Sequence, residues 1–281
     1  MFLFLPGFFN WKMLQMQRMN NGVYDIIDKI NIIFVRKRQR KSGGNSMGVR
    51  KHVSQLEFFE GIDPKTIEKL IKCGKIMEVP KGTMLIRARE SVEFVYFQLT
   101  GKSVIYNLTH DGKRKILFVF GQGALLNEHL FNNHTSSTYC ETMEKSKVLA
   151  FPVQEFVEGM QEDFCLTKRM LETQERKIWR LGHQLKNTTS SIYLERKLAA
   201  KLWKLSRDFG VETEEGIEID INLSITFLAD MLGVSRETTS RVCSILTESG
   251  LISIKKKRIF ISDPEKMAYF YKTGEIAQEN D

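Results

Sequence analysis

Four polar side chains in one short stretch carry groups that can recognise another molecule by hydrogen bonding: Arg236, Glu237, Ser240 and Arg241. A guanidinium group can donate two parallel hydrogen bonds to O6 and N7 of guanine, and a carboxylate can accept one from N4 of cytosine. Their spacing along the chain brings these groups into one stripe of a helix. The stretch therefore predicts a surface that reads the base edges of DNA.

Two predicted helices position this stripe. Ser224 is expected to cap a first helix that Gly233 ends, because glycine readily adopts the left-handed conformation found at helix C-termini. Ser235 is expected to cap a second helix that Gly250 closes. Two short helices joined by a glycine-containing turn predict a helix-turn-helix motif. Opposite the polar stripe, the second helix has an apolar side that is expected to pack on Leu228 and Leu232 of the first; it consists of Val242, Ile245 and Leu246.

A cationic hairpin is predicted directly after the helix pair. Two apolar strands within Leu251–Ser262 flank a run of lysine and arginine from Lys255 to Arg258. Alone, such a run is best interpreted as a solvated turn, but beside a helix-turn-helix it favours a wing that contacts phosphate. The predicted phosphate contacts are Ser224, Ser235, Lys255, Lys256, Lys257 and Arg258.

Upstream, many short apolar runs are separated by glycine turns, which is typical of a β-sandwich or jelly roll. Asp111-Gly112 between two such runs is a hairpin signal, because glycine tolerates a positive φ in a tight turn. The predicted strands are Lys75–Val79, Leu85–Arg87, Phe94–Leu99, Val104–Leu108, Lys115–Phe120, Thr138–Met143 and Lys147–Phe151. A helix before them is predicted to begin with Asp63 as its N-cap and Pro64 in its first turn.

One long helix, from Glu155 to about Ser190, is predicted between the two regions. A narrow apolar stripe with heptad-like spacing follows it: Phe164, Leu171, Ile178, Leu181, Leu185 and Ile192. We expect Leu171, Ile178, Leu181 and Leu185 to pair with a second copy across a dimer axis; the alternative is a helix packed on its own domain. A helix over Tyr193–Phe209, an acidic loop over Gly210–Gly216 and a strand over Ile217–Ile221 come next.

These elements predict an α+β chain with a jelly-roll domain (48–160), a dimerisation helix (161–192) and a winged helix-turn-helix domain (193–281). The family resemblance described below implies that the jelly roll is an effector-sensing domain. Residues 1–47 differ in composition and end in a basic run followed by Ser42–Ser46. We expect this extension to be non-native or disordered, with Met47 as the true start; the rival interpretation is a basic arm that helps to hold DNA.

Length and composition fit a protein of two domains. The 281 residues carry a formal net charge of +8, which suits a polyanionic partner and, on charge alone, equally a basic protein without one. Four scattered cysteines without a C-x-x-C pair argue against a zinc ribbon or an iron–sulfur cluster and fit a reducing cytosol. The first apolar run is too short for a transmembrane helix and lacks signal-peptide flanks, so a cytoplasmic protein with no membrane partner is expected.

The chain resembles the Crp/Fnr superfamily of bacterial regulators over about residues 52–267. The winged-helix signature is carried by 235–242, 248–252 and 261–263, and the cyclic-nucleotide-binding-type jelly roll by 79–86, 96–101, 111–117, Gly123 and Asn127-Glu128. The resemblance implies a homodimer that reads an inverted repeat in double-stranded DNA and contacts RNA polymerase. Glu237, Ser240 and Arg241 look like the Fnr-type readers of TTGA half-sites; Arg236 also matches the cyclic-AMP-receptor branch, which leaves the half-site open.

The resemblance also defines an effector pocket. Cyclic-nucleotide binders of this family neutralise the phosphate with an arginine, but 123–138 contains none, and Ser136 or Ser137 stands at roughly that position. We therefore predict an unidentified small effector other than cyclic AMP and no resident cofactor. The predicted pocket residues are Gly123, Asn127, Glu128, Ser136, Ser137 and Thr138. The alternative is a cyclic-nucleotide- or haem-responsive regulator with the same DNA-binding domain, in which His129 or His134 would be the axial ligand of a haem.

Two other classes of function fit less well. A regulatory subunit without DNA contact would not need the recognition stripe or the cationic wing. An enzyme would need a nucleophile elbow, a metal-ligand cluster or a phosphate-binding loop, and none stands at credible spacing in this sequence. No catalytic residue and no metal site is therefore predicted.

Overall fold

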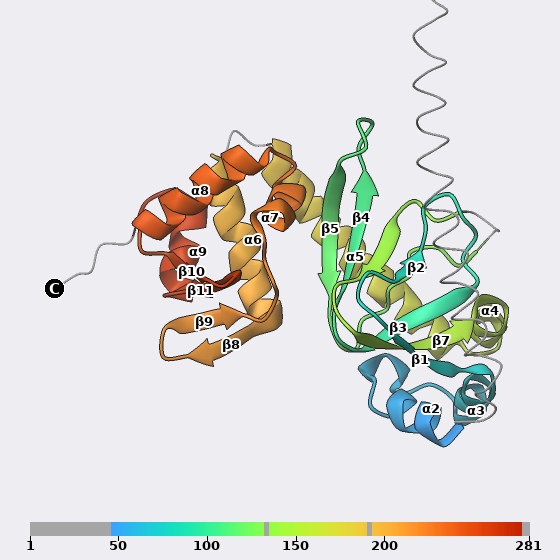
Figure 1. Cartoon of the computed structure of the whole chain (residues 1–281). Coiled ribbons are helices and arrows are strands. Elements are labelled where there is room, and N and C mark those ends of the chain that lie inside the picture. Colours follow the sequence, from blue (N-terminus) through green and yellow to red (C-terminus); the bar gives the residue numbers. More distant parts are fainter. Residues whose placement is uncertain (1–45, 132–134, 190–192, 277–281) are drawn as a thin grey trace, which may run out of the picture. The chain divides into compact units, whose positions relative to one another are not determined.

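The computed structural model describes residues 46–131, 135–189 and 193–276 (Figure 1). Residues 1–45 of the N-terminal extension that was expected to be non-native or disordered lie outside them, whereas Ser46 and Met47, assigned to the same extension, begin the helix α2 (Ser46–Val53). Seven strands form an antiparallel jelly roll whose two sheets have the orders β1-β7-β3 and β2-β6-β4-β5. Each strand lies within one residue of its predicted bounds. They are β1 Lys75–Val79, β2 Met84–Ile86, β3 Phe94–Thr100, β4 Ser103–Leu108, β5 Arg114–Phe120, β6 Tyr139–Thr142 and β7 Ser146–Pro152.

Short helices cover one end of the jelly roll: α2 Ser46–Val53, the 3-10 helix η1 Glu57–Phe59, α3 Pro64–Cys73 and α4 Val153–Glu162. Asp63 caps α3 as predicted, because its carboxylate accepts a hydrogen bond from the backbone N–H of Lys65 at 2.7 Å. A cluster of aromatic rings fills the space between these helices and the strands, and it consists of Phe58, Phe59, Phe97, Phe151 and Phe156. Burial of these rings anchors the helices to the sheet.

The predicted helix from Glu155 to Ser190 is wrong as a single element. The structure has two helices, α4 and the longer α5 (Phe164–Thr189), with a break at Asp163. The backbone N–H groups of Cys165 and Asp63 donate to the Asp163 carboxylate at 2.8 Å each. Asp163 therefore starts α5 like an N-cap and binds it to the entry of α3, a long-range contact that helical periodicity does not reveal.

The C-terminal domain contains α6 Leu194–Phe209, β8 Gly210–Thr213, β9 Gly216–Ile219, α7 Ile225–Leu232, α8 Arg236–Glu248, β10 Ile252–Lys255, β11 Arg258–Ile261 and α9 Pro264–Thr273. Its four-stranded sheet has the order β10-β11-β9-β8. The acidic loop predicted over Gly210–Gly216 is partly wrong, since β8 pairs with β9 in register from Gly210 to Thr213. All four residues of β8 are exposed. The strand therefore has no buried face, and its sequence lacks the alternation of apolar and polar residues from which a strand is predicted.

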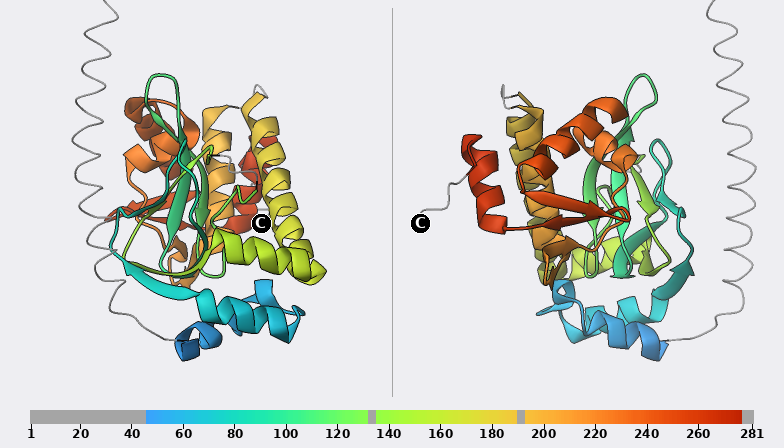
Figure 2. Two further views of the ribbon diagram at one scale, coloured as in Figure 1. Left: turned by 90° about the vertical axis from the view of Figure 1, so that its right-hand side faces the viewer. Right: turned by 60° about the vertical axis from the view of Figure 1, so that its left-hand side comes forward.

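The sensor and the DNA-binding domain share one apolar cluster. Val104 and Ile116 of β4 and β5 belong to the same cluster as Leu198 and Leu202 of α6. Helix α5 runs alongside the sheets (Figure 2) and is hydrogen-bonded to them, since Gln184 donates to the backbone carbonyl of Leu117 at 2.9 Å. Movement of either domain would expose part of this shared apolar surface to water.

The turn between α7 and α8 gives a test of this packing. Gly233 has a φ of 78°, and a Cβ there would lie 2.8 Å from Nζ of Lys115 on β5. Gly233→Ala should add left-handed strain and displace the hydrogen bonds of Lys115, at a combined cost of about 2–4 kcal/mol. Gly250→Ala is the matched control, because Gly250 also has a positive φ but a Cβ there meets nothing. Urea denaturation should show a cost of about 1 kcal/mol for the control; equal costs would contradict the contact.

Candidate nucleic-acid interface and sensor site

The helix-turn-helix forms with the predicted caps. The Ser224 hydroxyl accepts a hydrogen bond from the backbone N–H of Phe227, and the Ser235 hydroxyl accepts one from that of Thr238, both at 3.1 Å. Gly233 is in the left-handed region, and its N–H donates to the carbonyl of Ala229. These local bonds satisfy backbone groups at both helix starts and at the turn, and they fix where α8 begins.

Helix α8 separates its faces as the sequence predicts. Val242 and Leu246 are buried against the rest of the domain. Arg236, Glu237, Ser240 and Arg241, the four predicted base-reading residues, are all exposed. One expectation is wrong: Ile245 is 38% exposed and stands at the edge of the apolar face rather than within it.

Glu237 is poised to act as an acceptor. Its pKa is lowered, first because its carboxylate accepts from its own backbone N–H and then because the Ser235 hydroxyl donates to it. The group is therefore ionised at neutral pH, when it can only accept hydrogen bonds. That is the property needed to accept from the amino group of a cytosine.

The wing has a two-residue turn with an unusual composition. Strands β10 and β11 pair so that Lys255 faces Arg258, and Lys256 and Lys257 form the turn with φ values of 48° and 67°. Positive φ at both positions is the type I′ geometry, which asparagine and glycine normally occupy. The turn places two lysines, both exposed, at the tip of the hairpin.

The other two wing cations already have acidic partners. The Lys255 ammonium lies 2.5 Å from Glu215, and the Arg258 guanidinium lies 2.7 Å from Asp220 and 3.4 Å from Glu218. These exposed pairs add little stability. They do neutralise much of the positive charge of the two residues that flank the turn, and leave the charge at the tip, on Lys256 and Lys257.

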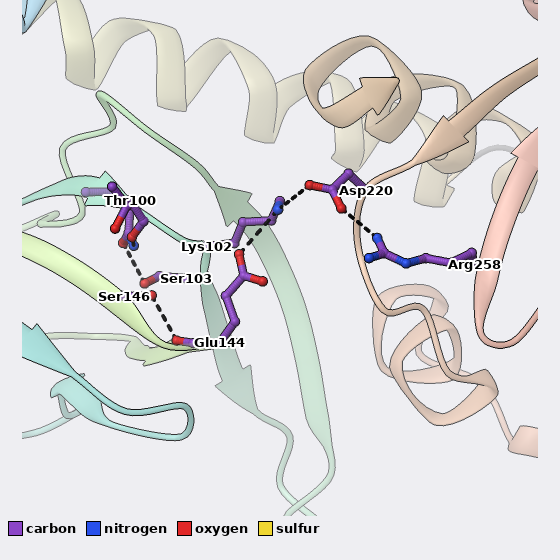
Figure 3. Close-up of polar contacts among 8 residues, drawn as sticks. Thr100, Lys102, Ser103, Glu144, Ser146, Asp220 and Arg258 are labelled. Atoms are coloured by element: carbon purple, nitrogen blue, oxygen red, sulfur yellow. Dashed lines mark hydrogen bonds and ion pairs between the residues drawn. The ribbon is translucent and has the colours of Figure 1, made fainter. Parts of the chain in front are cut away.

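Asp220 links the wing to the sensor (Figure 3). One oxygen accepts from Arg258, and the other lies 3.0 Å from the ammonium of Lys102, in the turn between β3 and β4. The same ammonium lies 3.3 Å from Glu144. The sequence alone does not predict this bridge, because nothing in the order of residues indicates that positions 102 and 220 meet.

Lys115 makes a second connection between the domains. Its ammonium donates to the carbonyls of Met231 and Leu232 at 3.1 and 2.8 Å, at the C-terminal end of α7. Carbonyls at a helix C-terminus lack helical partners and carry partial negative charge, so a cation there is favourable. The sensor strand thereby completes the helix-turn-helix. Neighbouring Arg114 lies 3.4 Å from Glu141 and 3.9 Å from Asp230 of α7.

The polar side chains of the predicted effector pocket form hydrogen bonds with other groups of the protein. Asn127 is fully buried; its amide oxygen accepts from the backbone N–H of Tyr96 and its amide nitrogen donates to the carbonyl of Phe94. Ser137 and Thr138 both donate to the Glu128 carboxylate. The structure places these predicted residues in two groups of hydrogen bonds, one around Asn127 and one around Glu128. Ser136 joins the group around Glu128 through Thr138, whereas Gly123 is exposed, has a φ of 82° and donates to the carbonyl of Gln98.

A lysine that sequence analysis did not single out lies against these hydrogen-bonded residues. Lys177 of α5 is 7% exposed and donates to the backbone carbonyl of Asn127 at 2.7 Å. Within the described residues it has no carboxylate at ion-pair distance. Burial lowers its pKa to about 8, opposed by the nearby charge of Glu128. The sequence could have indicated this residue only by placing a lysine on the side of α5 that faces the sensor domain.

The stripe on α5 is exposed in the single chain. The four predicted dimer residues Leu171, Ile178, Leu181 and Leu185 are 40–67% exposed, and Phe164 and Trp179 are exposed too. Leu166 and Met170 of the same helix are buried in the sensor core. The alternative in which the stripe packs on its own domain therefore does not hold for these four residues. Ile192 lies outside the described residues.

In 46–131, 135–189 and 193–276 there is no group of three or more His, Cys, Asp or Glu residues arranged to hold a metal ion. Within the same ranges, no helix has the length and hydropathy needed to cross a membrane.

A jelly roll joined by a long helix to a winged helix-turn-helix defines a DNA-binding transcription regulator. Family models agree: residues 76–163 match the cyclic nucleotide-binding domain, and residues 196–270 match the Crp-like helix-turn-helix domain. The chain belongs to the Crp/Fnr family of transcription regulators, a family of regulators rather than enzymes.

Similar proteins come from several bacteria. The chain is 21% identical over 217 residues to a CRP-like cAMP-activated global transcriptional regulator of Mycobacterium tuberculosis. The matched region covers 77% of this chain and 96% of the relative. It is 26% identical over 178 residues to the global nitrogen regulator of a Synechocystis species, covering 62% of this chain and 79% of the relative.

Solved structures share the fold. FixK2 from Bradyrhizobium japonicum matches with a TM-score of 0.62 at 17% identity, covering 70% of this chain and 96% of that one. The c-di-GMP responsive global regulator CLP from Xanthomonas campestris matches with a TM-score of 0.60 at 19% identity, covering 72% of this chain and all of that one (100%).

The buried charge of Lys177 has a measurable consequence. Lys177 loses its proton near pH 8 in the folded chain, against an ordinary pKa of 10.5. Between these values the unfolded chain binds more protons, so this group makes the free energy of unfolding rise with pH by up to about 1.4 kcal/mol per unit. Lys177→Met removes that rise. The stability of the variant relative to wild type should therefore fall between pH 8 and 10, measured by urea denaturation; a constant difference would contradict the burial of the charge.

Proposed function

We propose that this chain is a sequence-specific transcription regulator that binds an inverted-repeat DNA site as a homodimer and responds to a small effector other than cyclic AMP. The observation that carries the proposal is the exposed polar stripe at the start of α8, held by capped helix ends with its apolar side buried. A helix with hydrogen-bonding groups in its first turns suits the major groove.

Base reading would come from Arg236, Glu237, Ser240 and Arg241. Both arginines can make bidentate contacts with guanine, and Glu237 is ionised and ready to accept from cytosine. The Glu–Ser–Arg combination favours TTGA half-sites, in line with the Fnr-type readers that these residues resemble.

Backbone contacts would come from the helix starts and the wing. Lys256 and Lys257 are the foremost candidates, because the type I′ turn presents them at the tip. Lys255 and Arg258 would have to leave their carboxylate partners to reach phosphate. Ser224 and Ser235 would contribute through the helix N-termini that they cap, where backbone N–H groups favour anions.

Loss of base discrimination is the direct test of the recognition helix. Arg241→Ala and Glu237→Ala should each reduce the preference for a palindrome of TTGA half-sites over scrambled DNA by about 1–3 kcal/mol per half-site contact, measured by fluorescence anisotropy at fixed salt. Glu214→Ala, in the exposed turn between β8 and β9, is the control and should keep the full preference.

If both variants discriminate as wild type does, α8 does not read the bases. If wild type itself binds both DNA sequences equally, the TTGA assignment is wrong.

Dimerisation would use the apolar stripe of α5. Coiled-coil pairing buries a and d positions that are exposed in a single helix, and Leu171, Ile178, Leu181 and Leu185 meet that requirement. A two-fold axis through this helix pair would present two recognition helices to the two halves of an inverted repeat.

Polar substitution of the stripe should separate the protomers. The double variant Leu171→Ser with Ile178→Ser should give a mass near the 32.6 kDa of one chain in sedimentation equilibrium, whereas wild type gives twice that value. Arg176→Ser, exposed on another face of α5, should leave the dimer intact. A wild-type monomer, or a double variant that stays dimeric, would contradict the assignment.

The proposed effector differs from cyclic AMP because the pocket loop contains no arginine and its hydroxyls are already bound to Glu128. Family membership does not settle the effector, since one similar protein is named as cAMP-activated and another as c-di-GMP responsive. Haem binding is not favoured, because a lone histidine in a polar loop, such as His129, is more often structural or solvated; His134 lies outside the described residues. RNA polymerase is the proposed protein partner, by family resemblance alone.

A further inference from the structure

A cleft opens where the sensor, α5 and the DNA-binding domain meet, and its wall ends at Gln122, directly before Gly123 of the predicted effector pocket. Its walls are the β3–β4 turn (100–102), the end of β5 with its following turn (119–122), Arg180 of α5 and the end of α6 (207–209). Its volume is about 640 Å³. This falls within the range of small-molecule sites.

The cleft has more positive than negative charge. Lys102, Arg180 and Arg207 line it with a single carboxylate, that of Asp208. Asp208 is already paired with Lys204 one turn earlier in α6. Asp208 also forms an ion pair with Arg180 at 3.5 Å, a long contact that uses one of the five N–H donors of the guanidinium. Arg180 therefore has donors to spare for an anion.

Aromatic rings supply the apolar part of the wall. Phe120 and Phe209 both line the cleft. The Arg180 guanidinium lies 5.2 and 5.8 Å from the ring centroids of Phe118 and Phe120, so ring faces hold it in addition to its ion pair with Asp208. Phe209 packs on Gly121, where an added Cβ would lie 2.8 Å from the ring. Cations beside rings suit a ligand with both an anionic group and an apolar body.

We propose that this cleft binds an organic anion, with its oxyanion held by Arg180, Arg207 and Lys102 and its aromatic or apolar body against Phe120 and Phe209. This site shares no residue with the predicted effector pocket, whose polar groups are satisfied internally. Its ligand is defined by chemistry: a carboxylate, sulfonate or phosphate on an apolar frame.

A ligand in the cleft would affect the ion pairs that join Lys102, Asp220 and Arg258 in Figure 3. The Lys102 ammonium that lines the cleft also holds Asp220, which in turn holds Arg258 of the wing. An anion drawn to Lys102 competes with Asp220 for the same donor. A ligand that touches all three elements therefore has different affinities for different domain arrangements, which is the condition for shifting their equilibrium.

The test uses two fluorescent probes of nearly equal shape. 8-Anilinonaphthalene-1-sulfonate carries an anionic group on aromatic rings, and N-phenyl-1-naphthylamine is the same frame without the charge. The full chain should bind the sulfonate saturably, with one site per chain, and bind the neutral probe at least about tenfold more weakly. Arg180→Gln and Arg207→Gln should each weaken sulfonate binding by about tenfold, because each removes a charge-assisted contact.

Arg176→Gln is the matched control, with the same change of charge on the same helix outside the cleft, and should bind as wild type does. Arg180→Lys keeps the charge and should bind more tightly than Arg180→Gln. Circular dichroism verifies that each variant is folded. The proposal is overturned if the sulfonate does not bind, if both probes bind equally, or if the folded Arg180→Gln and Arg207→Gln variants bind as wild type does.

Discussion

The hydrogen bonds from the Lys115 ammonium to the last two carbonyls of α7 are the contact on which the arrangement of the DNA-binding domain depends. The helix end needs a partner for its carbonyls, and the sensor strand β5 supplies a cation. Gly233 makes this approach feasible, since its φ of 78° turns the chain and its missing side chain leaves room for Lys115. The helix-turn-helix is thus completed by a residue of the other domain.

Charge and apolar burial act together at this boundary. The shared apolar cluster of β4, β5 and α6 favours the docked domains. Around it, cations of the sensor meet carboxylates and carbonyls of the DNA-binding domain, as Lys102 meets Asp220. Such bonds are weak enough to exchange partners. The proposed anion would compete for these cations, which a purely apolar boundary would not offer.

Local rules predicted the helix-turn-helix almost completely. Ser224, Ser235 and Gly233 are capping and turn residues whose effect extends over a few neighbours, so their positions alone indicate the structure. The jelly-roll strands were equally predictable, because they are short apolar runs with side chains buried in the core, and several of them end at glycine turns. The α8 stripe needed no tertiary information, since helical periodicity separates its faces.

Features that depend on distant residues escaped prediction. The break at Asp163 rests partly on a bond to Asp63, a hundred positions earlier. The exposed strand β8 exists through pairing with β9 rather than through burial. Lys177, Lys102 and Asp220 acquire their roles only when separate elements meet, and no local pattern distinguishes them from other surface charges.

Selection of DNA from a random-sequence pool by the full chain tests the central claim most directly, because it presumes no half-site. The account predicts enrichment of an inverted repeat whose half-sites are centred one helical turn apart, as two recognition helices related by a dimer axis require. Enrichment of no sequence, either by the chain alone or with cellular small-molecule extract added, would contradict a sequence-specific dimeric regulator.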